Sequence, residues 1–238
     1  TSKLILPGFI DLHIHGGGGR DLMEGGDAAR TISKIHAQNG TTSYLATVAT
    51  GAEVALEQAL IGIKQSIDHR DYGEAFILGI HLEGPYINNE KLGAQPRRTR
   101  EFNLSEIEKL HGIVPISIIT LAPELLSDLE IIKLLVEMGI SVQLGHTNAS
   151  YEQADQALQA GAKSFTHLYN AMSGLHHRSP GAVGAALAQA EFAELILDFV
   201  HVHPGACRSA LRAIPKLYFV TDATAATGMP DGDYKLGV

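Results

Sequence analysis

Short apolar runs and amphipathic helical patterns alternate along most of the chain, and this alternation restricts the fold more than any other feature. The apolar runs, each of strand length, cover 8–15, 42–50, 75–83, 115–122, 140–146, 164–168, 195–201 and 217–222. The helical patterns between them cover 27–39, 53–67, 104–112, 127–138, 150–160, 185–194 and 204–213. Strands that alternate with helices in this way form a parallel sheet that is buried on both faces.

The number of strands separates two parallel architectures. Eight strands favour a closed (β/α)8 TIM barrel over an open, doubly wound sheet. Neither GxGxxG at the start of a helix nor GxxxxGK[ST] occurs, which weakens the open-sheet alternative further. A length of 238 residues suits one domain, so we expect a single barrel domain over 1–238. No helical pattern follows the eighth strand, and we therefore expect the barrel to be incomplete at its C-terminal end, without its last helix.

The charge and cysteine content argue against several kinds of partner. The formal net charge is −8 and the sequence pI is near 5.8, which disfavours a general binder of nucleic acid or of anionic membranes. Local arginines can still bind a phosphorylated ligand. Cys207 is the only cysteine, so no intramolecular disulfide can form, and a reducing, cytoplasmic setting is expected. We recognise no signal peptide and no apolar stretch of membrane-spanning length.

Polar side chains lie at the ends of most predicted strands. In a (β/α)8 barrel the carboxyl ends of the strands meet at one mouth, where active sites lie. Several imidazoles and two carboxylates at one mouth suit Zn²⁺ or another borderline divalent cation, so we expect a metal site there. In strand order, these residues are His13 and His15, Glu83, His146, His167, His201 and Asp222.

The remaining histidines and one aspartate have less specific interpretations. A single histidine at a strand end is more often structural than a metal ligand, and only the complete set favours a metal site. His81 is expected deeper in the barrel, packed or orienting a ligand, and Asp11 is expected either to orient a ligand histidine or to bond to the backbone. His203 could be either a structural residue or a ligand. We expect surface positions for His36, His69 and His111.

These parts suit metal-assisted hydrolysis of an amide or a similar bond. A divalent cation lowers the pKa of bound water to about 7, which makes metal-bound hydroxide available as a nucleophile at neutral pH. Asp222 is placed to take the proton and to hand it to the leaving group, as general base and then acid. A neutral His201 beside the site can donate a hydrogen bond to a carbonyl oxygen that becomes an oxyanion.

Two long loops carry residues that suit an anionic substrate. The planar guanidinium of arginine matches the oxygens of a phosphate group. Arg178 is the better candidate, because it follows two histidines and precedes Ser-Pro-Gly in the loop that also holds Asn170 and Ala171. The other loop contains Gln95, Arg97, Arg98 and Arg100. Its arginines could bind a phosphate group or could simply be exposed to solvent.

Five segments resemble motifs of the amidohydrolase superfamily and, within it, of the N-acetylglucosamine-6-phosphate deacetylase family. The segments occur in the family's order and extend over nearly the whole chain, which makes the resemblance specific. They are PGFIDLHIHG at 7–16, HLEGP at 81–85, GHTNA at 145–149, THLYNAM at 166–172 and VTDA at 220–223.

The resemblance implies an activity and a role for each motif residue. The implied reaction removes acetate from N-acetylglucosamine 6-phosphate and leaves glucosamine 6-phosphate, a step of amino-sugar catabolism. Asp222 would be the catalytic acid and base, and His201 would contact the substrate near the scissile amide. Glu83, His146 and His167 would hold the main metal, Zn²⁺ or Fe²⁺, and His13 with His15 implies a second one. Sugar and phosphate contacts would come from Ala94, Gln95, Asn170, the backbone of Ala171, and Arg178.

The chain departs from the family pattern in two respects. Gln95 replaces a histidine that some members carry, which leaves that substrate contact open. The family's small β-sandwich domain, built from both termini, is expected to be absent from this chain. The family further implies a homodimer in which the neighbour contributes a phosphate contact.

Two other functions are weighed against the deacetylase. An amidohydrolase that acts on another amide, such as a cyclic one, often bridges two metals with a modified lysine on strand four, and 115–122 contains no lysine. A catalytically inactive, metal-binding sensor of sugar phosphates would have no need of the proton shuttle that Asp222 offers. A turnover assay separates the sensor from both enzymes.

Overall fold

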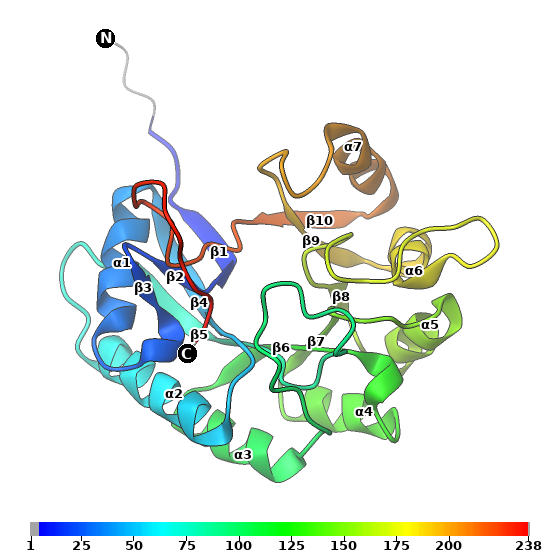
Figure 1. Ribbon diagram of the computed structural model, residues 1–238, viewed down its shortest axis with the longest axis horizontal. Coiled ribbons are helices and arrows are strands. Elements are labelled where there is room, and N and C mark those ends of the chain that lie inside the picture. Colours follow the sequence, from blue (N-terminus) through cyan, green and yellow to red (C-terminus); the bar gives the residue numbers. More distant parts are fainter. Residues whose placement is uncertain (1–4, 238) are drawn as a thin grey trace.

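The computed structural model describes residues 5–237, in which eight parallel strands curl around a common centre (Figure 1). Six of them form one sheet in the order β1-β4-β5-β6-β7-β8, and β9 pairs with β10. The expected α/β class, the parallel sheet and the eight strand regions are confirmed. The strands are β1 (Phe9–Ile14), β4 (Thr41–Val48), β5 (Phe76–Glu83), β6 (Ile116–Leu121), β7 (Ser141–Leu144), β8 (Ser164–Phe165), β9 (Phe192–Ile196) and β10 (Lys216–Val220).

Backbone hydrogen bonds continue the order of strands past the ends of these two sheets. The Leu168 N–H, beyond β8, donates to the Glu194 carbonyl of β9 at 2.9 Å. Beyond β10, the Asp222 N–H donates to the His13 carbonyl of β1 at 3.0 Å. The first and last strands of the chain therefore lie side by side.

Seven α-helices in the described part of the chain cover the outside of the strands in chain order (Figure 1). Their apolar faces pack on the outward-facing side chains of the strands, which buries one continuous apolar core. None of the helices described within residues 5–237 is both long and apolar enough to cross a membrane. The helices are α1 (Ala28–Gln38), α2 (Glu53–Asp68), α3 (Leu104–Ile113), α4 (Glu130–Glu137), α5 (Tyr151–Ala160), α6 (Gly181–Gln189) and α7 (Pro204–Ala213).

Local sequence signals set several helix ends. The Ser150 hydroxyl accepts the Gln153 N–H at 3.2 Å while the Gln153 side chain accepts the Ser150 N–H at 2.9 Å, a capping box that starts α5. Gly161, with a φ of 122°, ends the same helix in a conformation that glycine adopts at little cost. At α3, the Asn103 side chain caps the first turn through the Glu106 N–H.

The interior of the curled sheet is polar. His13, His81, Thr120, Gln143 and Glu194 are each at most 1% exposed and point toward one another from five different strands. Buried polar groups cost free energy unless they are hydrogen-bonded, so these side chains must satisfy one another. Together they form the floor beneath the mouth of the strands.

Two element boundaries differ from the sequence-based expectation in a way that affects the site. The helix expected over 185–194 is α6, which starts earlier and ends at Gln189. The strand expected over 195–201 is β9, and it ends at Ile196. His201 therefore lies in a turn beyond the strand, and Glu194 lies inside the strand and not in a helix.

The four glycines after β1 form a small hairpin that the sequence did not predict. Its strands are β2 (Gly16–Gly17) and β3 (Arg20–Asp21), and a short 3-10 helix, η1 (Leu22–Glu24), follows. A second 3-10 helix, η2 (Pro123–Leu125), follows β6. The expected surface position of His36 is wrong, because its ring is buried beneath this hairpin and bonds to the Gly16 carbonyl at 2.9 Å.

Candidate metal centre and active site

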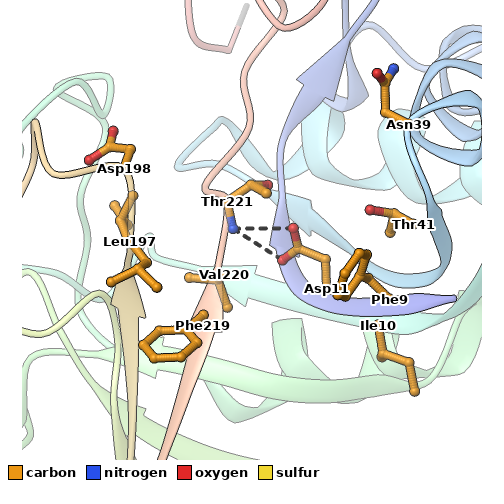
Figure 2. A pocket seen from close by; sticks show the side chains of 11 residues that line it. Phe9, Ile10, Asp11, Asn39, Thr41, Leu197, Asp198, Phe219, Val220 and Thr221 are labelled. Atoms are coloured by element: carbon orange, nitrogen blue, oxygen red, sulfur yellow. Dashed lines mark hydrogen bonds between the residues drawn. The ribbon is translucent and has the colours of Figure 1, made fainter. Parts of the chain in front are cut away.

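Two cavities lie near the junction of the first and last strands, and their chemistry separates them. The larger, of about 420 Å³, lies between β1 and the β9–β10 pair (Figure 2) and is lined mainly by apolar side chains such as Phe9, Ile10 and Phe219. Its buried carboxylate, Asp11, accepts the backbone N–H of Thr221 at 3.1 Å, as Figure 2 shows, and that of His13 at 3.1 Å. Asp11 thus bonds to the backbone on both sides of the junction, which the sequence left as one of two possibilities.

The smaller cavity, of about 280 Å³, collects the titratable residues of the mouth. Several convergent polar groups in a concave site are typical of a catalytic or ligand-binding pocket. We therefore take this cavity as the candidate functional site. It is lined by His15, Glu83, Gly93, Ala94, Gln95, His146, His167, Asn170, Ala171, Ile196, His201, Asp222 and Leu236.

Glu83 is at the centre of the site, and its two carboxylate oxygens face different histidines. Oε1 lies 3.1 Å from His146 Nε2 and 3.0 Å from His167 Nε2. Oε2 lies 3.0 Å from His15 Nε2. The carboxylate at the end of β5 thus lies between two groups of ligand-type atoms.

Each group offers three ligand atoms within 4.8 Å of one another. The first is Glu83, His146 and His167, and the second is His13, His15 and Asp222. Their imidazole Nε2 atoms lie close in pairs, with 3.1 Å between His146 and His167 and 3.2 Å between His13 and His15. Two imidazole nitrogens that both offer lone pairs at such a distance repel each other unless a proton or a cation lies between them.

In His146 and His13 the Nδ1 atom is hydrogen-bonded, which leaves the Nε2 atom of each ring free for a cation. His146 Nδ1 lies 2.7 Å from the Lys91 carbonyl, which can only accept, so Nδ1 carries the proton. His13 Nδ1 likewise lies 3.0 Å from the Glu194 carboxylate. In its neutral, cation-binding form an imidazole has one N–H, so the Nε2 atoms of both rings then present lone pairs to the neighbouring ligand-type atoms. This donor set of nitrogen and oxygen atoms fits a divalent cation such as Zn²⁺ or Fe²⁺.

The charges of the site depend strongly on one another. Burial alone would lower the pKa of His13, but Asp222, Glu83 and Glu194 raise it well above its ordinary value. Burial would raise the pKa of Glu83, but His13 and His146 hold it well below its ordinary value. Opposite charges at this distance therefore outweigh desolvation, and the carboxylates stay ionised.

Backbone strain is concentrated around the same cavity. Four of its residues other than glycine have a positive φ: His146 at 47°, His167 at 29°, Ala171 at 49° and Asp222 at 51°. Residues other than glycine rarely have a positive φ, and each one that does costs on the order of 1–3 kcal/mol of conformational free energy. Strain that clusters in this way is a feature of functional sites, where geometry outweighs stability.

The structure brings together most of the site residues that the sequence predicted. His13, His15, Glu83, His146, His167 and Asp222 lie at or just beyond the carboxyl ends of their strands. Ala94, Gln95, Asn170 and Ala171 line the same cavity. His201 also lines it, although its position at a strand end is wrong, and its Nδ1 is paired with Asp198 at 2.6 Å.

Other candidates lie elsewhere. Arg178 is exposed, donates to His177 Nε2 at 3.0 Å and is not among the residues that line the cavity. Arg100 pairs with Glu106 and donates to the Gly51 carbonyl, which is a structural role. His203 caps α7 through the Gly205 N–H, and His81 is packed beneath the site, bonded to Leu12 and Thr120.

Sequence reasoning missed the orienting roles of three side chains: it expected Gln95 only as a substrate contact, and it did not single out Glu124 or Glu194. Gln95 donates from Nε2 to Glu83 Oε2 and accepts the Thr50 N–H at 2.7 Å. Glu124, in η2, accepts hydrogen bonds from Asn88, Thr147 and Asn148 and so ties together the loops after β5 and β7. Glu194 lies against His13. Only Glu194 had a usable signal, as the single charged residue in the apolar segment 192–197.

The chain is similar to known proteins over nearly its whole length. The chain is 42% identical over 241 residues to the N-acetylglucosamine-6-phosphate deacetylase of Vibrio furnissii, with 98% of this chain and 60% of the relative covered. It is 38% identical to the N-acetylgalactosamine-6-phosphate deacetylase of Escherichia coli O157:H7, with 99% of this chain and 64% of the relative covered. The chain thus spans about three fifths of the length of these relatives.

A solved structure and a family model extend the likeness to the fold. The structure of a Mycobacterium smegmatis N-acetyl-D-glucosamine-6-phosphate deacetylase variant in complex with N-acetyl-D-glucosamine-6-phosphate matches with a TM-score of 0.89 and 35% identity. The match covers 97% of this chain and 61% of that one. The model of the amidohydrolase family matches residues 4–214, most of the chain. The chain therefore belongs to the amidohydrolase family.

Proposed function

We propose that the protein hydrolyses the acetamide of N-acetyl-D-glucosamine 6-phosphate to D-glucosamine 6-phosphate and acetate. The observation that carries the proposal is the convergence of Glu83, His146, His167 and Asp222 on one cavity, in a chain similar to deacetylases of this substrate. The main cation would be held by Glu83, His146 and His167. A second cation would be held by His13, His15 and Asp222. A bound divalent cation supplies an activated water and polarises the amide carbonyl.

Asp222 is the group that moves the proton. Its Oδ1 lies 3.3 Å from His13 Nε2 and 3.4 Å from His15 Nε2, and its side chain keeps 24% exposure toward the cavity. Burial would raise its pKa, but His13 and His15 lower it below the ordinary value, so the carboxylate is ionised at neutral pH. It can therefore accept a proton from water and deliver it to the amine nitrogen as the C–N bond breaks.

The remaining cavity residues bind and orient the substrate. His201, whose side chain is 52% exposed and whose Nδ1 donates to Asp198, would contact the substrate near the scissile amide through Nε2. Asn170, the backbone of Ala171, Ala94 and Gln95 would contact the sugar. Arg178 lies on the loop between Asn170 and α6, and we assign it to the phosphate as a part of this proposal.

Further parts of the proposal concern the setting of the reaction. The eight strands would be those of a (β/α)8 barrel that acts as one catalytic domain. The cation would be Zn²⁺ or Fe²⁺, with one or two per chain, because both suit a set of imidazole and carboxylate ligands. A cytoplasmic homodimer completes the proposal; the single, buried Cys207 supports the reducing compartment.

The test measures acetate released from N-acetylglucosamine 6-phosphate by the protein as isolated, after chelation, and after Zn²⁺ or Fe²⁺ is added back. We expect activity to disappear with the metal and to return with it. Turnover that persists after complete metal removal would contradict the mechanism. Binding of the phosphorylated sugar without any turnover would favour the inactive sensor.

The relative from Escherichia coli makes N-acetylgalactosamine 6-phosphate a second candidate substrate. The two sugars differ only in the configuration at C4, far from the amide, so the same cation and the same Asp222 serve both. Parallel assays with the two epimers decide between them by their ratio of kcat/KM.

A further inference from the structure

Glu194 is a fully buried carboxylate that the proposed reaction does not use. It lies in β9, directly beneath the cavity, and each of its oxygens has a defined partner. Oε2 lies 3.0 Å from His13 Nδ1 and 3.3 Å from the backbone nitrogen of His167. Oε1 accepts the hydroxyl of Tyr218 at 3.2 Å.

A chain of hydrogen bonds fixes the orientation of this carboxylate. The Gln143 amide donates to the Tyr218 oxygen at 2.8 Å, which leaves the Tyr218 proton to point at Glu194. The Gln143 oxygen in turn accepts the Thr166 hydroxyl at 2.9 Å. Glu194 is therefore held from β7, from the segment just beyond β8 and from β10, and it cannot rotate away from His13 without breaking buried hydrogen bonds.

His13 is held on its other face by the ring of His81, with centroids 4.5 Å apart and planes at 65°. His13, His81 and Glu194 could also be viewed as a third group of metal ligands. However, both His81 nitrogens are hydrogen-bonded, to the Leu12 carbonyl at 3.1 Å and to Thr120 at 2.7 Å. Because both nitrogens of His81 already have partners, these residues form a support for His13 and not a cation site.

We propose that Glu194 is a positioning residue that sets the affinity of the second cation position, His13, His15 and Asp222. The Glu194 carboxylate accepts the Nδ1–H of His13, which selects Nε2 as the ligand atom and fixes the direction of the ring. Its negative charge also makes the imidazole a stronger donor. The inference rests on the proposed function only in that the cavity holds divalent cations.

The test is calorimetric titration of the metal-free protein with Zn²⁺ alone. We expect the wild-type protein to bind two equivalents. Glu194→Ala should weaken the second equivalent by about 10- to 100-fold, the usual effect of removing an outer partner of a ligand histidine. Glu194→Gln keeps the volume and one acceptor oxygen, so it should restore part of the loss. Zn²⁺ affinity should fall less at the other group, Glu83, His146 and His167, since Glu194 contacts only the backbone of His167 there.

A double-variant comparison tests whether Glu194 acts through His13. His13→Asn should remove the second equivalent by itself, and Glu194→Gln should cause no further loss in that background. In the Zn²⁺-loaded protein, nitrogen NMR of the imidazoles should show a protonated His13 Nδ1, and this signal should shift in Glu194→Gln.

Glu106→Gln is the matched control. Glu106 is another buried carboxylate that accepts a tyrosine hydroxyl, from Tyr86 at 2.8 Å, but it lies on α3 and does not line the cavity. We expect this variant to bind both equivalents as the wild type does. Wild-type affinity for both equivalents in Glu194→Gln and Glu194→Ala would overturn the inference. A wild-type protein that binds one equivalent would also overturn it, while metal-dependent acetate release would still support the proposed function.

Discussion

At the scale of single residues, the backbone of Asp222 determines which substitution can test its chemistry. Its φ of 51° lies in the left-handed region, which asparagine and aspartate tolerate better than other residues with a side chain. Asp222→Asn therefore removes the proposed proton acceptor without adding strain. We expect acetate release to fall by about 10²- to 10⁴-fold, the usual contribution of general acid–base catalysis, while the melting temperature stays near that of the wild type.

The same measurement on Asp233→Asn, which changes an exposed aspartate, is the control for this prediction. Full activity is expected there. Should Asp222→Asn retain a rate near that of the wild type, another group must carry the proton.

Gln95 offers a second residue-level prediction, because it joins the proposed metal ligand Glu83 to the backbone just beyond β4. Gln95→Leu removes the hydrogen bond to Glu83 Oε2 and leaves the buried Thr50 N–H without an acceptor. An unsatisfied buried donor costs about 1–3 kcal/mol, so the free energy of unfolding should fall by that amount. Zn²⁺ affinity should fall by about 10- to 100-fold, as measured by titration of the metal-free protein.

Gln159→Ala is the control for Gln95, since the exposed Gln159 on α5 bonds to the partly exposed Asp155. Neither its unfolding nor its Zn²⁺ affinity should change. Unaltered Zn²⁺ binding in Gln95→Leu would show that Glu83 keeps its orientation without this partner.

At the scale of elements, two helical glycines should respond in opposite ways to the same substitution. Alanine is favoured over glycine in a helix by about 1 kcal/mol. At Gly62 in α2, however, a Cβ would lie 2.5 Å from the Gly26 nitrogen and 2.8 Å from the Gly25 carbonyl carbon, both rigid backbone atoms. Overpacking costs about 1–3 kcal/mol and the helical gain offsets about 1 kcal/mol of it, so Gly62→Ala should destabilise the protein by up to about 2 kcal/mol net.

A Cβ at Gly112 in α3 would meet nothing within 4 Å. Gly112→Ala should therefore stabilise the protein by about 0.5–1 kcal/mol. Denaturant unfolding of the two variants checks both signs, and a gain in Gly62→Ala would mean that α2 can move away from the Gly25–Gly26 turn.

The elements that sequence reasoning located well are those with strong local signals. The apolar run that ends at Glu83 and the capped helix after Ser150 were predicted almost to the residue, because patterning and capping are local. The segment around β9 was misplaced, because Phe199 and Val200 favour a strand as strongly as Phe192 does. What selects Phe192–Ile196 is its register with β10 and the contact between Glu194 and His13, and both partners are distant in sequence.

The same distinction holds for the site. The ligand-type residues could be predicted, since each ends an apolar run and parallel strands end at one mouth. Three other features could not be predicted. They are the position of Glu83 between two groups of histidines, the orienting roles of Gln95 and Glu194, and the burial of His36. Each depends on side-chain directions that arise only when the strands curl around one another.

At the scale of the whole molecule, the candidate metal centre joins the first strand to the last. His13 and His15 come from β1, Asp222 follows β10, and Asp11 bonds to the backbone on both sides of the junction. A cation bound only in the folded state stabilises it by about 2.7 kcal/mol at a concentration 100 times its Kd. Metal binding and closure of the strands should therefore be coupled.

The sign of the pH dependence should differ between the metal-free and the loaded protein. Carboxylates raise the pKa of His13 in the fold, and Glu83 raises that of His167, although burial opposes both shifts. A raised pKa contributes stability that is fully present below the unfolded value of about 6.5 and is lost as the pH rises through the folded value. The metal-free protein should therefore lose stability above about pH 6.5.

Cations compete with these protons, so the stabilisation by Zn²⁺ should grow over the same pH range. Thermal unfolding between about pH 6 and pH 9, with chelator and with excess Zn²⁺, measures both trends. His13→Asn should make the melting temperature of the metal-free protein less dependent on pH, because it removes the histidine that most carboxylates surround. A metal-free melting temperature that rises from pH 6.5 to 9 would mean that these histidines are neutral in the fold, and that the carboxylates around them do not outweigh their burial.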